Sequence, residues 1–423
     1  MNDFEATDFF RDASVVEDPF WYFDEARSRC PVYRESHHDV MLVTGYDEAR
    51  AIYHSTETFS SATSVTGPFP GFPVPLEGDD VSDLIEEHRD GLPFSDQLVT
   101  FDPPKHTQHR ALLMRLLTPK RLKENEDFMW QLADRQIDEI IDGGTCEFIA
   151  DYAGPYTLLV VCDLLGVPES DHETFRRRLG RGGHVGSNQE GGEMTRNPLE
   201  FLYEYFTSYI AERRVTPKND VLGSMAGATY PDGSVPDVSD VVHIAANLFA
   251  AGQETTIRLL GSALQIMGDR PDLQRLLRHE PERIPNFVEE TLRYESPVKG
   301  DFRLSRFTTE VGGVTIPGGS QVMVLNGAAN RDPRQFECPD EFRVDRENAR
   351  EHLAFGHGVH FCAGAHLARA EARITIERLL DRMSDISISE AEHGPAGARR
   401  YDYAPTFILR GLNQLHLAFT PAS

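Results

Sequence analysis

The amino-acid sequence predicts a mostly α-helical protein with small β-sheets, folded as one domain over residues 1–423. Apolar side chains recur at helical spacing in several segments, the longest at about residues 239–267. Short runs of strand-forming residues, bounded by turn residues, lie between these segments. The length alone would suggest two or three domains. Because no linker rich in Gly and Ser, low-complexity tract or internal repeat divides the chain, we expect a single large domain.

The chain is acidic, with 68 Asp and Glu against 42 Lys and Arg and a formal net charge of −26. This charge argues against nucleic acid or an anionic membrane as a partner. No apolar run approaches the ~18 residues that suggest a membrane span. The N-terminus also lacks the basic and apolar regions of a signal peptide. We therefore expect a cytoplasmic monomer without a membrane anchor.

The five cysteines are odd in number and scattered, which argues against a disulfide framework. No cysteine cluster suits an iron–sulfur centre, and no convincing G-x-G-x-x-G follows a strand. The chain therefore has no electron-carrying module of its own, and any electrons must come from another protein.

Near the N-terminus, we expect a short amphipathic helix over residues 17–30 and a second over 46–53, with paired strands at 32–34 and 40–43 between them. Together they form a small β region in a mostly helical chain.

A proline-rich segment covers residues 67–78 and carries Phe69 and Phe72. Its prolines preclude a regular helix or a central strand. The segment is either a flexible surface loop or a lid over an apolar ligand.

The next helix opens after Phe101, and His106 and Arg110 lie four residues apart on one of its faces. By itself, this is a solvated basic face. Apolar residues between 148 and 168 predict a buried helix, and the glycine-rich stretch from 180 to 192 predicts a flexible loop.

The long helix at about 239–267 follows a capping segment that includes Ser239. Asn247, Ala251 and Thr255 recur every four residues, so they share one stripe. Gly252 lies mid-helix, where glycine costs about 1 kcal/mol relative to alanine. The glycine and the polar break behind it indicate either a local distortion at a functional site or an ordinary helix with a close neighbour.

Residues 355–365 carry the most specific pattern, F-G-H-G-V-H-F-C-A-G-A. Apolar residues at helical spacing follow it, so Cys362 lies at a helix N-terminus, where N–H groups and the helix dipole favour a thiolate. An inert buried cysteine is the ordinary alternative. A zinc site using nearby histidines lacks the usual paired ligand spacing.

The string F-G-x-G-x-H-x-C-x-G resembles the haem-binding loop of cytochromes P-450, and every fixed position matches. Four further motifs occur in the order found in that family, so the resemblance spans roughly residues 30–420. They are D-P-P-x-H-x-x-x-R from Asp102, A-G-x-[DE]-T-[TS] from Ala251, E-x-x-R from Glu290 and A-N-R-D-P from Ala329.

The resemblance implies a single-domain cytochrome P-450 fold that binds haem b, iron protoporphyrin IX. It assigns Cys362 as the axial iron ligand within a loop that includes Gly364. The donors to the haem propionates would be His106, Arg110, Arg303 and His360.

For the oxygen-activation helix, the resemblance implies that Ala251 and Gly252 leave room for O2 and that Thr255 and Glu254 relay protons. Glu254 replaces the more usual Asp. Glu290 and Arg293 would form a structural cluster with Arg346 behind the cysteine loop.

The implied reaction is monooxygenation of R–H with O2 to R–OH and water. NAD(P)H would supply electrons through a separate ferredoxin and ferredoxin reductase. A peroxide-driven peroxygenase and a non-catalytic haem-thiolate binding or sensor protein are the alternatives. The Glu254–Thr255 pair argues against both.

The expected substrate pocket is mainly apolar and would suit a terpenoid, steroid-like or aromatic molecule. Its expected lining is Phe69, Phe72, Asn247, Leu248, Val298, Lys299 and Phe407, the last from a hairpin tip at 405–409. Asn247 can form hydrogen bonds there. Lys299 would either extend toward a propionate or solvent or anchor a substrate carboxylate.

Overall fold

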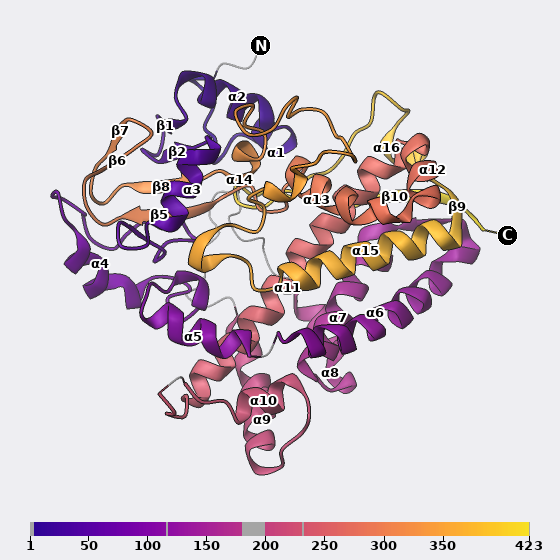
Figure 1. The fold of residues 1–423 in the computed structure, drawn as a ribbon, viewed down its shortest axis with the longest axis horizontal. Coiled ribbons are helices and arrows are strands. Elements are labelled where there is room, and N and C mark those ends of the chain that lie inside the picture. Colours follow the sequence, from indigo (N-terminus) through magenta and orange to yellow (C-terminus); the bar gives the residue numbers. More distant parts are fainter. Residues whose placement is uncertain (1–3, 116, 180–198, 231, 423) are drawn as a thin grey trace.

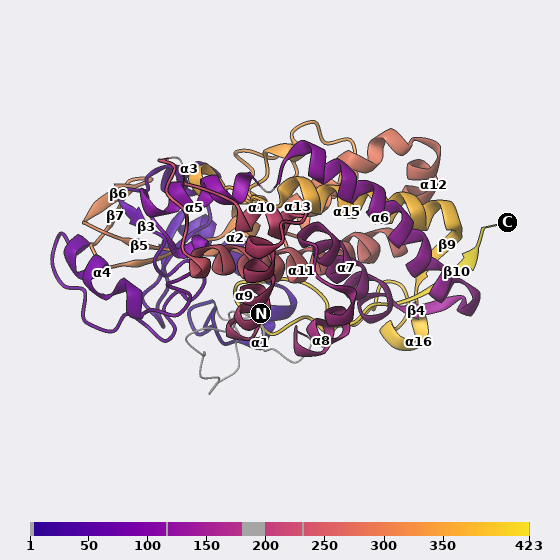
Figure 2. The same cartoon turned by 90° about the horizontal axis from the view of Figure 1, so that it is seen from below.

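The computed structural model describes residues 4–115, 117–179, 199–230 and 232–422. The strands of the largest sheet lie at one end of the molecule, and most of the longer helices form the other end (Figure 1). The view turned by 90° separates the same two regions (Figure 2). None of the described helices is long and apolar enough to cross a membrane.

The α-helices in chain order are α1 Ala13–Glu17, α2 Phe20–Arg29, α3 Tyr46–His54, α4 Ser82–His88, α5 Lys105–Met114, α6 Pro119–Ile140, α7 Gly154–Leu165, α8 Glu169–Leu179, α9 Glu200–Val215, α10 Val221–Ala226, α11 Val238–Gly268, α12 Pro271–His279, α13 Ile284–Tyr294, α14 Asn326–Ala329, α15 Ala365–Arg382 and α16 Glu390–His393. Short helical turns connect several of them, among them one at Gly358–His360.

The strands are β1 Val32–Arg34, β2 Met41–Val43, β3 Phe59–Ser60, β4 Thr145–Glu147, β5 Asp301–Ser305, β6 Thr309–Val311, β7 Val314–Ile316, β8 Gln321–Val324, β9 Met383–Ile388 and β10 His416–Pro421. The main sheet has the order β1-β2-β8-β5-β3 and mixes antiparallel pairs with the parallel pair β2–β8. A second sheet, β4-β10-β9, lies beside the helices, and β6 and β7 form a hairpin.

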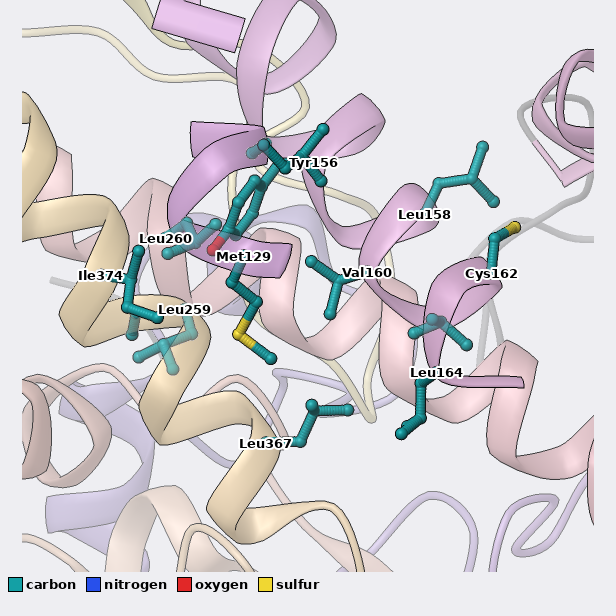
Figure 3. Packing of buried hydrophobic residues seen from close by; sticks show 14 of the residues in the cluster. Met129, Tyr156, Leu158, Val160, Cys162, Leu164, Leu259, Leu260, Leu367 and Ile374 are labelled. Carbon is teal, nitrogen blue, oxygen red and sulfur yellow. The ribbon is translucent and has the colours of Figure 1, made fainter. Parts of the chain in front are cut away.

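The hydrophobic core lies where α6, α7, α11 and α15 meet. Met129, Val160, Leu260 and Ile374 come from these four helices and converge there (Figure 3). All four are fully buried, and burial of each such side chain stabilises the fold by ~1.5–3 kcal/mol. In this core α11 packs against α15.

Several predicted elements match the structure closely, namely β1, β2, α3 and α11. The helix expected at 148–168 instead has two parts, a wider turn at Ile149–Ala153 followed by α7. Pro155 lacks an N–H for the helical ladder, which explains the change of winding. The stretch from 180 to 192, expected as a flexible loop, lies outside the described residues.

The strand expected from Val298 begins later, at Asp301. Val298 forms only an isolated bridge with Leu409, and the Lys299 N–H donates to Ile408 O at 2.6 Å. The segment at 405–409 therefore does lie beside residues 298–299, although it forms no regular hairpin strand there.

Candidate active site

The Cys362 loop is held in place by its own backbone and by α3. The Cys362 N–H donates to Phe355 O at 2.9 Å. Gly358 has φ +69°, and a Cβ there would lie 2.4 Å from Tyr53 O of α3. Only glycine fits this close approach and left-handed backbone. The loop leads directly into α15 at Ala365, so Cys362 does lie at a helix N-terminus, as the sequence predicts.

The Cys362 side chain is exposed, yet protein atoms surround it densely enough that burial raises the pKa of its thiol. A cysteine on the wall of a recess would be both accessible to solvent and surrounded by protein atoms. The N–H of Gly364 and the guanidinium groups of Arg110 and Arg369 oppose this rise in the pKa, because each favours the thiolate.

The middle of α11 is also open. Ala251 is exposed and Thr255 is half-buried, whereas the residues on either side of this stretch are mostly buried. The exposure therefore marks a gap in packing along a core helix. The same helix packs against α15, which begins just after Cys362.

Basic side chains from three segments gather near the Cys362 loop. The rings of His106 and His360 lie 4.0 Å apart, and Arg110 Nη2 donates to Phe361 O at 2.6 Å. Arg303, on β5, is buried and donates from Nη1 to Asp301 Oδ1 at 3.0 Å. The structure thus brings the four predicted propionate donors into one region.

The surroundings of His106 and His360 favour their neutral form. Burial and Arg110 lower the pKa of His106 to about 4, and burial and Arg303 lower the pKa of His360 to about 2. Both ring nitrogens of His106 are buried without a hydrogen-bond partner in the described chain. Buried donors without a partner cost free energy, and an anionic ligand would accept hydrogen bonds from them. The side chains of this region are therefore suited to bind an anion.

On α11, Thr255 Oγ1 donates to Ala251 O at 2.9 Å, and Glu254 pairs with Arg258 one turn later. A Cβ at Gly252 would lie 3.2 Å from Val161 Cγ2 of α7. The glycine therefore allows close packing of two helices, the ordinary alternative that the sequence left open. The distorted turn suggested near Glu254 is not present, because α11 continues as an α-helix through it.

The predicted pocket residues Phe69, Phe72 and Phe407 fall in two places. Phe407 is buried, with its ring 5.3 Å from that of Phe10 and 5.7 Å from that of Phe69. Phe72 packs in a separate cluster near His88. Their role in a substrate pocket stays a prediction, and the contact of Phe407 with Phe10 is one that the sequence did not indicate.

Three further pocket predictions have mixed outcomes. Leu248 belongs to the helical core, and Asn247 and Val298 are half-buried. Lys299 is fully buried, and its Nζ donates to Thr406 O at 2.6 Å. The expectation that Lys299 extends toward solvent was wrong. Burial lowers its pKa well below the usual range, and the nearby Arg410 and Arg258 add to that effect.

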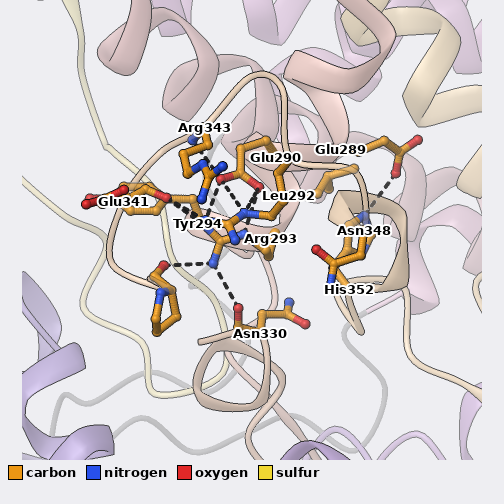
Figure 4. A network of polar contacts seen from close by, with 12 residues as sticks. Glu289, Glu290, Leu292, Arg293, Tyr294, Asn330, Glu341, Arg343, Asn348 and His352 are labelled. Carbon is orange, nitrogen blue, oxygen red and sulfur yellow. Dashed lines mark hydrogen bonds and ion pairs between the residues drawn. The ribbon is translucent and has the colours of Figure 1, made fainter. Parts of the chain in front are cut away.

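The predicted Glu290 cluster is assembled in the structure, and Figure 4 shows Glu290 and Arg293 in contact within it. Arg293 makes paired contacts with Glu290, Nε to Oε2 at 2.7 Å and Nη2 to Oε1 at 2.8 Å. Arg346 Nε lies 3.1 Å from both oxygens of the same carboxylate. All three side chains are buried, and the guanidinium groups also bind carbonyls of residues 330–341. The cluster therefore joins α13 to the segment that precedes the cysteine loop.

Sequence reasoning missed a second charged group next to this cluster. Glu289 contacts Arg369 and His352, and these three residues come from α13, α15 and the segment between them. The available signal was a second acid adjacent to Glu290 and an arginine seven residues after Cys362. Both would pass for surface charges on amphipathic helices, because only the tertiary fold brings them together.

Comparison with known proteins agrees with this geometry. A family model for cytochrome P450 matches residues 192–390. Cytochrome P450 144 of Mycobacterium tuberculosis is 34% identical over 98% of this chain and 92% of its own length. The 6-deoxyerythronolide B hydroxylase of Saccharopolyspora erythraea is 32% identical over 93% of this chain and 95% of its own.

Solved structures are similar over the whole chain. The substrate-free form of Mycobacterium marinum cytochrome P450 CYP150A6 has 54% identity and a TM-score of 0.93, and covers 100% of both chains. CYP109E1 from Bacillus megaterium, solved with corticosterone, has 26% identity and a TM-score of 0.79 over 95% of this chain and 98% of its own.

The chain belongs to the cytochrome P450 family. It is a monooxygenase, an oxidoreductase that incorporates oxygen, and its cofactor is haem b. The donor set described above fits haem, because a cysteine sulfur at a helix N-terminus suits the iron and partnerless His106 nitrogens suit carboxylates.

Proposed function

We propose that Cys362 is the axial ligand of the haem iron and that the opening beside α11 receives O2 and an apolar substrate. The observation that carries this proposal is the exposed Cys362 just before α15, close to Arg110 and to the partnerless ring nitrogens of His106. Bound haem supplies the redox chemistry of oxygen activation, which protein side chains cannot provide.

We propose that His106, Arg110, Arg303 and His360 bind the propionates. Carboxylates would pair with the Arg110 guanidinium and would give His106 a partner for its buried ring nitrogens. Charge-assisted hydrogen bonds of this kind are about twice as strong as neutral ones. Arg303 already contacts Asp301, so its guanidinium would contact two carboxylates, that of Asp301 and a propionate.

On α11, we propose that Thr255 and Glu254 move protons from solvent toward the opening. Glu254 is partly exposed, with 36% of its side chain accessible, so it can exchange protons with water. Its contact with Arg258 favours the ionised carboxylate. Glu254 must therefore turn away from Arg258 to pass a proton on to Thr255. The Thr255 hydroxyl, now bound to Ala251 O, can rotate to donate into the opening.

Thr255→Ala tests this role. We expect haem content and substrate affinity to change less than about twofold, while product formed per NAD(P)H falls about tenfold and peroxide rises to match. Oxygen consumption, peroxide and product are measured together. Thr256→Ala is a neighbouring control with a buried hydroxyl. An unchanged product ratio in Thr255→Ala would show that this hydroxyl does not relay protons.

We propose that electrons reach the haem from NAD(P)H through a separate ferredoxin and its reductase, in the cytoplasm. The chain carries no recognisable flavin or iron–sulfur motif of its own. The family assignment supports a route through partner proteins.

The proposed substrate is a bulky apolar molecule. Relatives include proteins named for 6-deoxyerythronolide B and vitamin D3 hydroxylation, and a similar structure holds corticosterone. Half-buried Val298 and Asn247 remain candidates for contact with such a substrate. Burial of its surface would contribute about 25 cal/mol per Å2.

The role of Lys299 decides whether the proposed substrate is neutral or acidic. Its ammonium contacts Thr406 O, and substrate carboxylate binding would require that contact to break. We therefore expect wild type to bind an apolar acid no more than about threefold tighter than its methyl ester, because desolvation opposes the charge. Ligand-induced spin-state titrations of wild type and Lys299→Met measure this. A strong acid preference that Lys299→Met abolishes would instead identify Lys299 as a carboxylate anchor.

A further inference from the structure

The group missed by sequence reasoning is a buried ion pair with defined geometry. Glu289, on α13, accepts from Arg369 Nε at 2.7 Å and from Arg369 Nη2 at 3.0 Å, one bond to each carboxylate oxygen. Its side chain is only 5% exposed. The paired contact holds the guanidinium plane in one orientation, which a single bond would not do.

His352 completes the group. Its Nδ1 accepts from the Ala354 N–H at 3.2 Å, so the proton of the neutral ring lies on Nε2. That nitrogen lies 3.0 Å from Glu289 Oε2 and donates to it. Hydrogen bonds from His352 and Arg369 outweigh burial and lower the pKa of Glu289 to about 2. Glu289 is therefore ionised at neutral pH.

Arg369 connects this pair to the cysteine loop. Its guanidinium carbon lies 4.5 Å from the centre of the Phe355 ring, and Phe355 O accepts the hydrogen bond from Cys362 N–H. Arg369 thus contacts the loop through Phe355, and this contact places its positive charge beside the backbone that holds Cys362.

The pair is separate from the Glu290 cluster. Glu289 and Glu290 are adjacent on α13, but their side chains point in different directions (Figure 4). Glu290 binds Arg293 and Arg346, whereas Glu289 contacts Arg369, His352 and, at 3.5 Å, the exposed Arg350. The two adjacent carboxylates therefore form ion pairs with different segments of the chain.

We propose that Glu289 and Arg369 are positioning residues that set the charge behind the Cys362 sulfur and thereby tune the reduction potential of the haem iron. This inference rests on the proposed role of Cys362. Reduction adds an electron to the iron site, so Arg369 stabilises the reduced state and Glu289 opposes it. Because the two charges are paired, the wild-type potential reflects the small difference between their effects.

The test is the reduction potential of purified holoprotein at about pH 8, where a histidine of ordinary pKa is neutral. Glu289→Gln should make the potential more positive and Arg369→Gln should make it more negative. Each should change the equilibrium constant for reduction by about three- to tenfold. The double variant should return close to wild type. Arg350→Gln removes a charge that is 74% exposed, so we expect little shift in that control.

A purely structural role would give a different pattern. Both single variants would then shift in the same direction or not at all, and the double variant would be the most perturbed. Either result overturns the proposal. Should Arg369→Gln fail to retain haem, Arg369→Lys carries the test. It keeps the charge but loses the paired contact, so the potential should stay near wild type, and a shift as large as that expected for Arg369→Gln would contradict the inference.

The role of Cys362 is checked independently by the carbonyl complex of reduced wild type. Absence of a thiolate-type absorption band there would refute the proposed function itself. A normal band combined with shifts of the same sign in both single variants would refute only the inference about Glu289 and Arg369.

Discussion

Cys362→His is expected to abolish monooxygenation while part of the haem remains bound. The proposed propionate donors on α5 and β5 are untouched by this change, so we expect them still to hold the cofactor. An imidazole donates less electron density than a thiolate, and O–O cleavage depends on that donation. We expect activity to fall at least ~100-fold. The reduced carbonyl complex should lose its red-shifted, thiolate-type absorption band.

Cys30→Ser is the matched control for this experiment. Cys30 is a half-buried, free cysteine that ends α2, so its substitution changes a thiol without affecting the loop. The spectrum and activity of Cys30→Ser should equal those of wild type. A thiolate-type band that survives in Cys362→His would mean that another residue binds the iron.

The parts of the fold that the sequence predicted well depend on local patterns. β1 follows from its strand-forming residues, and α3 and α11 follow from helical periodicity within each segment. The position of Cys362 at the start of α15 follows from helical spacing after the loop glycines. Such signals need no knowledge of what packs against the segment.

The features that the sequence did not predict depend on contacts between distant segments. Phe407 is buried against Phe10, which is almost the whole chain away, and Lys299 is buried against Thr406 rather than reaching solvent. Gly252 matches an oxygen-activation motif, but its missing side chain also accommodates Val161 of another helix. A motif identifies residues, whereas the direction of each side chain is decided by its tertiary neighbours.

The two charged clusters illustrate the same limit. Glu290, Arg293 and Arg346 were identified through a family motif, and the structure brings them together with full burial. Glu289, Arg369 and His352 have no comparable motif, although their contacts are equally direct. Spacing on a helix does not distinguish a buried ion pair from an exposed one, because both give the same sequence pattern.

Arg293→Ala is expected to destabilise the protein far more than the loss of an exposed arginine. Its guanidinium is fully buried, binds both Glu290 oxygens and also donates to carbonyls of Asn330, Pro339 and Glu341. Removal leaves the buried Glu290 carboxylate with Arg346 and the Arg343 N–H, and it removes the arginine donor from the Asn330 and Pro339 carbonyls. Breaking one side of a buried pair costs about 3–5 kcal/mol. We therefore expect little soluble holoprotein and a large drop in the free energy of unfolding in urea.

Arg283→Ala is the control, because Arg283 forms an ion pair with Glu280 at the surface, where both side chains are 39% exposed. Such exposed pairs contribute ~1 kcal/mol or less, so this variant should retain haem and unfold close to wild type. Urea unfolding and haem content of both variants are compared at the same pH. If Arg293→Ala loses no more stability than Arg283→Ala, the Glu290 cluster does not support the cysteine loop, and the segment before Cys362 must be held by its remaining contacts, such as the hydrogen bond from Leu353 N–H to Asn330 Oδ1.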